Sequence, residues 1–253
     1  MYYVFDGTYM GYLTGLFVCF EFKEFDVTPV LQGKVSGTLF ETNRIIYTDL
    51  EKSNRILKAL SKIITKAQVD DFFRIFLSED SKAWEIGYRI LIKIFQGRAD
   101  ILQNYGSSEI LYFSQTLKKV SRERHRMKAF VRFKKDNNGI YTSIVEPDFN
   151  VLPLITGFFK NRYADQKWLI YDVKRAYGYY YNLEFVSEVA LHEDNSTKNS
   201  SGISISFDPN EEQVQNLWKS YFKGTNIESR RNMKLHLRHV PKRYWKYLTE
   251  KQR

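Results

Sequence analysis

The stretch 129-AFVRFKKDNNGIYTSIVE-146 predicts a β-hairpin, and this hairpin is central to the expected fold. Apolar and polar side chains alternate over 129–134, and β-branched residues recur over 140–146. Between them lies Asp-Asn-Asn-Gly at 136–139, and Asn-Gly is a strong hairpin-turn signal because both residues tolerate positive φ. We therefore expect two antiparallel strands joined by a tight turn.

A helix is expected immediately before this hairpin, over residues 107–127. Its apolar residues recur at spacings of three and four, as on the buried face of an amphipathic helix. They are Ile110, Phe113, Leu117, Val120 and Met127. Arg124 occupies an apolar position in the same register, so we expect it either to be paired in the core or to end the buried face early. Further helical segments precede this one from residue 50 onward.

Segments typical of strands lie on both sides of the helical block. They are 2–5, 44–48, 129–134, 140–146, 167–172, 177–182 and 184–190. A helix over about 150–163, with Asn150 as its N-cap, separates the hairpin from the last three. This order predicts the α+β class, with a mainly antiparallel sheet, a helical insertion and a basic helical C-terminal tail.

The length is enough for one large domain or two small ones, and we expect a single domain over 1–253, because the tail is too short to fold alone. Within it we expect one sheet, built from strands before and after the helices, and a polar loop that separates the sheet from the tail. The expected parts are the sheet portion 1–49 and 128–191, the helical insertion 50–127, the loop 192–207 and the helical tail 208–253.

The tail carries two helix signals. Asp208-Pro209 is typical of a helix start and precedes an apolar stripe that we expect to be buried. The stripe consists of Val214, Leu217, Trp218, Tyr221 and Phe222. Asn226 is expected to cap a second, basic helix that ends near His239, and Pro241 to open a last helical turn.

Composition limits the chemistry that the chain can hold by itself. The only cysteine is Cys19, so the chain alone cannot supply the ligands of an iron–sulfur cluster. No apolar run is long enough to span a bilayer, and the N-terminus lacks the pattern of a signal peptide. We expect a cytoplasmic protein with no membrane partner and with no metal or cofactor of its own.

Positive charge is concentrated in two short stretches. Residues 118–135 carry nine Lys and Arg against one acid, and residues 223–253 carry ten against two, so each has a net charge of +8. The whole chain is only +10, and aromatic residues are interleaved with the cations. Such a concentration of like charge is tolerated where a polyanion relieves the repulsion, and it therefore predicts contact with nucleic acid.

In the first stretch the cations are expected to lie along one strand face. On a strand, Lys128, Arg132 and Lys134 share a face and can follow a phosphate backbone. The alternative is the ordinary solvated face of a sheet. DNA is the expected polyanion, and its strandedness is left open.

In the second stretch the cations are expected to lie along a helix. Arg230, Lys234 and Arg238 are four residues apart and form a continuous stripe. A solvated helix face is again the alternative. The two stretches together supply the candidate DNA contacts, which are Arg122, Arg126, Lys128, Arg132, Arg230, Arg231, Lys234, Arg238, His239, Arg243, Tyr244 and Trp245.

The signals for catalysis are weak. His125 could transfer a proton, with Asp6 or Asp165 as the accompanying carboxylate, although helix capping explains His125 and Asp6 equally well. His236 and His239 have a spacing that a helical zinc site could use, but no cysteine or carboxylate group supports such a site. No motif of a serine hydrolase, zinc protease, phosphate-binding loop or dinucleotide fold is present.

Four blocks of the sequence resemble a bacterial family of unknown function whose members are often labelled probable DNA metabolism protein. The blocks are Tyr3–Thr8, Glu123–Phe133, the segment from Phe158-Phe159 to Tyr171-Asp172, and the segment from Ile227 to Trp245 that ends in Pro-Lys-Arg-Tyr-Trp. The resemblance spans nearly the whole chain, and residues 50–105 are its least characteristic part.

This resemblance implies a role in DNA repair or modification. Members of the family are typically encoded beside a radical SAM protein, and some are fused to a uracil-DNA-glycosylase-like domain. The resemblance thus implies a radical SAM partner and a uracil-DNA-glycosylase-like protein as a further partner. An iron–sulfur cluster and S-adenosylmethionine are expected only in the radical SAM partner, since the cluster ligands are lacking here.

Three functional hypotheses follow. The first is a DNA-binding accessory protein of DNA repair or modification that acts with a radical SAM partner. The second is a nucleic-acid-processing enzyme, a nuclease or base-processing activity that uses His125 with acidic residues. The third is a protein-interaction module whose basic surfaces bind an acidic partner. Salt-dependent DNA binding, turnover on a lesion-bearing oligonucleotide, and partner capture without DNA affinity distinguish them.

Overall fold

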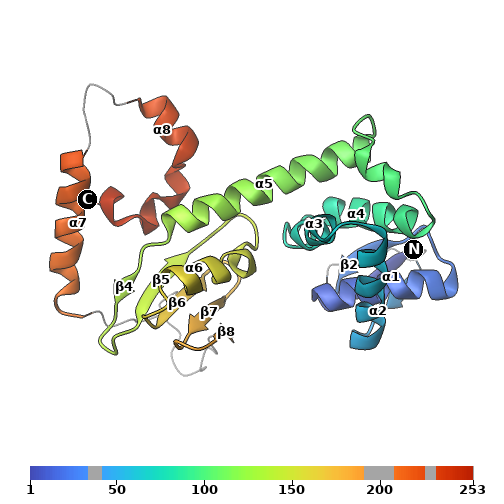
Figure 1. Ribbon diagram of the computed structural model, residues 1–253, viewed down its shortest axis with the longest axis horizontal. Helices are drawn as coiled ribbons and strands as arrows, with labels where there is room; N and C mark the ends of the chain where they lie inside the picture. The colour runs from blue at the N-terminus through green and yellow to red at the C-terminus, as the bar shows by residue number, and fades with distance from the viewer. Residues whose placement is uncertain (34–41, 191–207, 226–231, 253) are drawn as a thin grey trace. The chain divides into compact units, whose positions relative to one another are not determined.

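The computed structural model describes residues 1–33, 42–190, 208–225 and 232–252 (Figure 1). The chain divides into two compact units, Met1–Ser121 (unit 1) and Arg122–Arg253 (unit 2). Each unit has its own sheet, with strand order β2-β1-β3 in unit 1 and β4-β5-β6-β7-β8 in unit 2. The expected common sheet of 1–49 and 128–191 is therefore wrong. The expected single domain over 1–253 stays a prediction.

Unit 1 is a parallel sheet surrounded by helices. Strand β1 pairs in parallel with both β2 and β3. The strands are β1 Tyr2–Phe5, β2 Thr28–Leu31 and β3 Asn43–Ile45, and the helices are α1 Tyr9–Phe22, α2 Leu50–Ile63, α3 Lys66–Phe76, α4 Ser81–Phe95 and the 3-10 helix η1 Ala99–Gln103. Helix α5, Ser108–Phe130, begins in this unit. The expected strand at 2–5 and the expected helices before residue 100 are confirmed.

Aromatic side chains form a series of hydrogen bonds to backbone carbonyls in the core of unit 1. The Tyr88 hydroxyl donates to the carbonyl of Tyr12 (2.6 Å), and the Tyr12 hydroxyl donates to the carbonyl of Trp84 (2.8 Å). Trp84 Nε1 in turn donates to the carbonyl of Phe76 (2.8 Å). Gly15 of α1 permits this arrangement, because a side chain at this position would collide with the Tyr88 hydroxyl.

Unit 2 contains a five-stranded sheet in which one pair of strands is parallel. Its strands are β4 Lys134–Lys135, β5 Tyr141–Val145, β6 Trp168–Asp172, β7 Tyr177–Tyr181 and β8 Val186–Ala190. Only β5 and β6 are parallel, because the chain crosses between them through the 3-10 helix η2 Leu152–Leu154 and α6 Thr156–Arg162. The mainly antiparallel sheet is thus confirmed for unit 2 and wrong for unit 1, where every strand pair is parallel.

The hairpin that opens this sheet is shorter than its sequence predicts. Its turn is confirmed, since Gly139 has φ 79° and its N–H donates to the carbonyl of Asp136 (3.0 Å). The strand expected at 129–134 is wrong, because α5 continues to Phe130 and β4 covers two residues. The reason is the spacing of Met127 and Val131, which are both buried and stay in helical register through a 3.1 Å hydrogen bond. Lys128 therefore lies on a helix.

The tail is helical, as expected. It consists of α7 Glu211–Thr225, α8 Met233–His239, and the 3-10 helices η4 Lys242–Tyr247 and η5 Thr249–Lys251. Asn232 caps α8 by accepting from the N–H of Leu235 (3.0 Å). The expected cap Asn226 and the expected loop 192–207 lie outside the described residues.

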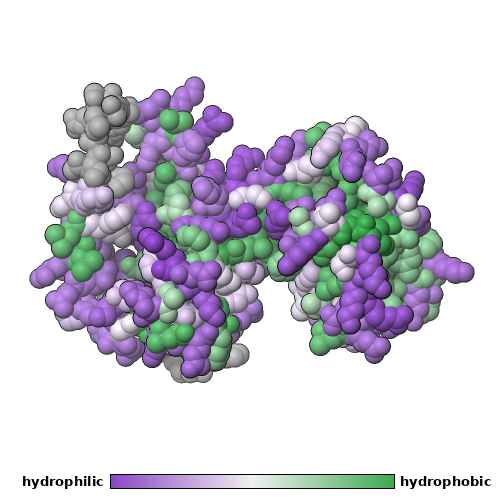
Figure 2. Space-filling view, viewed as in Figure 1, coloured by the Kyte–Doolittle hydropathy of each residue, from purple (hydrophilic) through white to green (hydrophobic). Residues whose placement is uncertain are grey.

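The apolar stripe of α7 is exposed, contrary to expectation. Val214 is 56% exposed, Leu217 70% and Tyr221 63%. The helix is held instead through Glu211, which accepts from the N–H of Lys135 (3.0 Å), and through Trp218, whose Nε1 donates to Glu250 (3.0 Å). Of the stripe, Trp218 thus contacts the end of the tail, whereas Val214, Leu217 and Tyr221 stay largely exposed. Figure 2 shows an apolar area where Figure 1 places α7.

None of the described helices is both long and apolar enough to cross a bilayer.

Candidate nucleic-acid interface

Nearly all of the net positive charge of the chain belongs to unit 2. This unit contains 24 Lys and Arg against 15 Asp and Glu, a net charge of +9, whereas unit 1 contains 15 against 14, a net charge of +1. The excess is therefore a property of one compact unit. This charge can bind an anion only where the cations are not already paired with carboxylates of the same unit.

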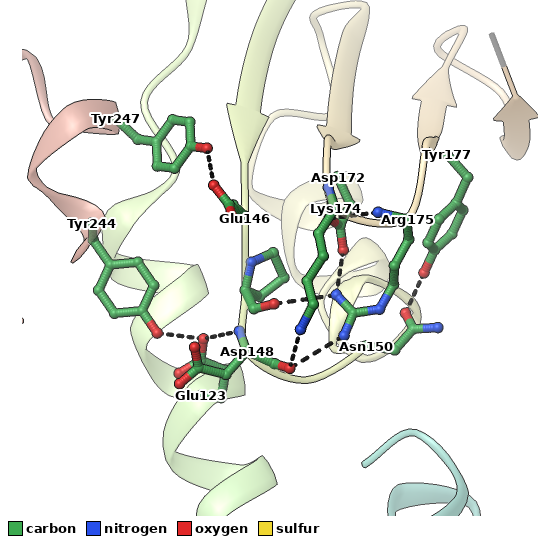
Figure 3. Close-up of polar contacts among 11 residues, drawn as sticks. Glu123, Glu146, Asp148, Asn150, Asp172, Lys174, Arg175, Tyr177, Tyr244 and Tyr247 are labelled. Carbon is green, nitrogen blue, oxygen red and sulfur yellow. Dashed lines mark hydrogen bonds and ion pairs between the residues drawn. The ribbon is translucent and has the colours of Figure 1, made fainter. Parts of the chain in front are cut away.

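Three of the expected DNA contacts, Arg126, Arg243 and Tyr244, belong to a cluster around the buried Glu123 of α5. Glu123 is 1% exposed, and its carboxylate accepts from the Tyr244 hydroxyl and from the N–H of Asp148 (2.9 Å) (Figure 3). The guanidiniums of Arg126 and Arg243 lie 3.6 Å and 3.7 Å from the same carboxylate, and Arg243 also pairs with Asp148 at 2.5 Å. These five residues, the Glu123 cluster, join α5, the loop after β5 and η4.

The state of Tyr244 agrees with an internal role. Its side chain is buried, and both burial and the hydrogen bond to Glu123 raise the pKa of its phenol well above the ordinary value. The phenol therefore stays a neutral donor to the carboxylate. The sequence predicts a surface aromatic residue among cations here, whereas the structure has a core residue.

Two further carboxylates hold the tail. Arg132 pairs with Glu250 at 2.7 Å, and this carboxylate also accepts from Trp218. Glu146 accepts from the Tyr247 hydroxyl (2.7 Å) (Figure 3) and also from Lys246. The hydrogen bonds from Lys246 and then Tyr247 lower the pKa of Glu146. Arg132 is thus engaged within the protein, although the sequence places it among the DNA contacts.

The edge where parallel strands β5 and β6 end is filled by its own ion pair. Asp172 is fully buried and pairs with Arg175 at 2.7 Å, and Arg175 also donates to the carbonyls of Pro147 (3.2 Å) and Asp148 (3.3 Å). Burial raises the pKa of Asp172 more than Arg175 lowers it. Asn150, the expected helix cap, accepts from Tyr177 instead (Figure 3). Ligands often bind at such an edge, but here the arginine occupies it.

A second group of cations is exposed on the tail. Lys234 and Arg238 lie one turn apart on α8, followed by His239 and by Lys242 at the start of η4. All four side chains are exposed, and none forms a hydrogen bond or ion pair within the described part of the chain. We call these four residues the α8 surface. Arg230 and Arg231, which the sequence assigns to the same stripe, lie outside the described residues.

A third group surrounds an exposed ring between α5 and α6. Lys128 Nζ lies 4.8 Å from the centre of the Phe158 ring, and Phe158 is 41% exposed. Arg162 is exposed one turn further along α6, and Arg124 is half-buried one turn before Lys128 on α5. No ion pair engages these three cations in the ranges that the structure covers. We call these four residues the α5–α6 patch.

Sequence reasoning includes Lys128 but misses the other members of this patch as DNA contacts. Phe158 and Arg162 are four residues apart, which places them together on the exposed face of a helix. This spacing could have identified the pair, but the contact with Lys128 depends on the packing of α6 against α5. Arg124 follows neither of its two expected alternatives, because it is half-buried without a described carboxylate partner, while Met127 and Val131 beyond it are still buried.

The remaining expected contacts have mixed positions. Trp245 is half-buried, and its Nε1 donates to the carbonyl of Val240 (3.0 Å). The nearest cation to its ring is Lys251, at 5.4 Å. Arg122 is exposed on α5.

The expected catalytic residues belong to different units, His125 and Asp165 to unit 2 and Asp6 to unit 1. His125 and Asp165 are both exposed, and within the described chain no hydrogen bond or ion pair joins them. Asp6 belongs to unit 1, where it accepts from Thr8 and from Thr48 (2.7 Å). Although burial raises the pKa of Asp6, these hydrogen bonds outweigh it and leave the pKa below the ordinary value. Thr8, not Asp6, is the N-cap of α1. Catalysis by His125 stays a prediction.

These features define a protein of mixed helices and strands whose second unit is basic and carries two open cationic surfaces. The chain belongs to the family DUF4130, a domain of unknown function, whose model matches residues 81–250. The match covers more than half of the chain and includes both the α8 surface and the α5–α6 patch. No curated protein and no solved structure matches the chain with significance.

Proposed function

We propose that this protein is a DNA-binding accessory protein of DNA repair or modification that acts in the cytoplasm with a radical SAM partner. The observation that supports DNA binding is the α8 surface, whose cations are exposed and unpaired among the described residues of a unit of net charge +9. The partner is supported by the resemblance of the four sequence blocks. An iron–sulfur cluster and S-adenosylmethionine would belong to that partner, since Cys19 is the only cysteine here.

The α8 surface suits a phosphate backbone. Lys234 and Arg238 are about 6 Å apart along the helix axis, because each residue adds about 1.5 Å. Phosphate can bind these two cations without breaking an ion pair among the described residues. Arg132 and Arg243, in contrast, are each paired with a carboxylate. Each phosphate neutralised on duplex DNA lowers the logarithm of the binding constant by about 0.9 per tenfold increase in salt.

Charge reversal tests this proposal. The variant Lys234→Glu/Arg238→Glu/Lys242→Glu is expected to weaken DNA binding about a hundredfold at low salt and to reduce the salt slope by about 3, as for three lost phosphate contacts. Fluorescence anisotropy over a salt series measures both quantities. The matched control is Lys58→Glu/Lys62→Glu/Lys66→Glu in unit 1, where three exposed lysines allow the same change of charge. Equal losses in the two variants would contradict a local DNA site.

Binding of a protein partner is a second function with an observation of its own. The stripe Val214, Leu217 and Tyr221 on α7 is exposed, and an amphipathic helix of this kind fits an apolar groove on another protein. We propose the radical SAM protein as its occupant. Leu217→Glu is expected to weaken capture of the purified partner without changing DNA affinity. Unchanged capture would remove α7 from the interface.

The enzyme hypothesis keeps its own test. A nuclease or base-processing activity predicts turnover of a lesion-bearing oligonucleotide by the protein alone. His125→Ala abolishes that turnover if His125 transfers the proton. Turnover that survives the substitution would place the chemistry elsewhere.

A further inference from the structure

We infer that the α5–α6 patch binds an unpaired nucleotide and gives the protein a preference for single-stranded over duplex DNA. This inference rests on the proposed DNA-binding function and adds the strandedness of the substrate. It assigns a site to Phe158 and Arg162, which lie outside the two basic stretches of the sequence.

The ring of Phe158 is held in place but open to solvent. Its neighbour Phe159 is 2% exposed and packs against Phe158 edge to face, with ring centres 5.1 Å apart and planes at 83°. This contact anchors the ring to the core under α6. The remaining surface of Phe158 is 41% exposed. An exposed ring of fixed orientation is suited to stacking, because little side-chain freedom is lost when a flat ligand binds.

The positive charges around the Phe158 ring favour the binding of an anion. Lys128 lies 4.8 Å from the ring centre, and the electron-rich face of the ring compensates only part of this one positive charge. Arg124 and Arg162 lie one helical turn from Lys128 and Phe158, and no described carboxylate pairs with any of the three cations. A ligand that relieves this charge must bring a negative group to within a few ångströms of the ring.

An unpaired nucleotide combines the two required features. Its base offers a flat face for Phe158, and its phosphate offers the charge for the surrounding cations. A duplex hides its base faces in the stack and presents hydrogen-bonding edges, which a phenylalanine cannot read. An acidic peptide matches the charge but brings no flat group to the ring. The arrangement therefore favours single-stranded DNA.

The experiment compares one oligonucleotide in two forms. Fluorescence anisotropy is measured at fixed salt with a labelled single strand and with the duplex of the same length. The unmodified protein is expected to bind the single strand more tightly. Phe158→Ala is expected to weaken single-strand binding about tenfold and duplex binding less than twofold, because one stacking contact is lost. Phe158→Trp, which keeps a flat ring, should retain the preference.

Phe22→Ala is the matched control in unit 1. Phe22 is 53% exposed and lies 4.2 Å from the Arg44 guanidinium, so it reproduces a ring with a cation above it in the unit of low net charge. Its removal should leave both affinities unchanged. If Phe158→Ala does not fold, Lys128→Gln/Arg162→Gln tests the same patch, and an unchanged single-strand affinity in that variant would overturn the inference.

The outcomes separate this inference from the proposed function. Equal binding of both forms, or equal losses for both forms in Phe158→Ala, would overturn the inference. DNA binding would stand in that case if charge reversal of the α8 surface still abolished it. Absence of binding to either form by the unmodified protein would overturn the inference and the proposed function together.

Discussion

The two units use different chemistry for their buried polar groups. In unit 1 the buried polar residues among the described ones are Thr14, Ser53, Ser78 and Thr116. Three aromatic donors of its core bind backbone carbonyls, and a fourth, Tyr3, donates to the half-buried carboxylate of Glu24. In unit 2 the buried polar residues include three carboxylates, Glu123, Asp172 and Glu211. Every buried charged residue among the described ones thus belongs to the unit with the excess of positive charge.

This difference shows how the anion-binding cations of a basic protein can be located. The carboxylates of unit 2 bind part of its cations, and these pairs position the tail and the loop after β5. The cations of the α8 surface and the α5–α6 patch have no carboxylate partner among the described residues, so their charge is available for a ligand. The net charge of a segment therefore predicts that an anion binds. The ion pairs between cations and carboxylates within the fold indicate which cations can bind it.

Removal of the Glu123 carboxylate should have the largest effect on stability. Glu123→Ala leaves the buried Tyr244 phenol and the N–H of Asp148 without their acceptor and Arg126 without its anion, so we expect a loss of about 3 kcal/mol in the free energy of unfolding. Urea denaturation measures the loss, and hydrogen exchange assigns it to unit 2. Glu21→Ala removes an exposed carboxylate of unit 1 that pairs with Lys52 and should cost less than about 1 kcal/mol. Equal losses would abolish the contrast between the units.

A neutral hydrogen bond of unit 1 should have a smaller effect that does not depend on salt. Tyr88→Phe removes the donor to the Tyr12 carbonyl, and we expect a loss of about 1 kcal/mol because one buried hydrogen bond is lost. Urea denaturation at low and high salt measures it. Tyr47→Phe, at an 80% exposed position, is the control and should change nothing. A strong salt dependence would show that charge also stabilises this core.

The smallest effect should appear only in acid. Burial raises the pKa of Glu250, but hydrogen bonds from Arg132 and Trp218 outweigh it, so the folded pKa lies below the ordinary 4.5. Ionised Glu250 therefore stabilises the fold above pH 4.5, and this stabilisation is lost as the pH falls through the folded pKa. Glu250→Gln should be less stable than the unmodified protein at neutral pH, and this difference should shrink in acid. A difference that is constant from neutral to acidic pH would contradict the role of the charge.

Local signals in the sequence predict much of the fold but not the pairing of the cations. The turn at 136–139 and the last three strands are confirmed, because Asn-Gly chemistry and alternation act over a few residues. The strand at 129–134 is wrong because the spacing of its apolar residues fits a helix face as well, and the neighbours of Met127 decide between them. Strand partners also depend on distant segments, which explains why two sheets were not predicted.

The candidate site shows the same limit. Lys234 and Arg238 are exposed on a helix as their spacing predicts. Arg126, Arg132 and Arg243 have equal charge in the sequence, but their partners Glu123, Glu250 and Asp148 are identified only by the fold. Phe158 of α6 belongs to the candidate site because its ring contacts Lys128 of α5. No local sequence pattern predicts this contact between two helices.

The fastening of the tail by Glu123, Glu146 and Glu250 has a practical consequence for handling the protein. Truncation after residue 241 would delete Tyr244, Lys246 and Tyr247. It would thus leave the carboxylates of Glu123 and Glu146 without these hydrogen-bond donors. A shortened recombinant version would thus lose more than its last basic residues, and a protease that clips there would damage the interior.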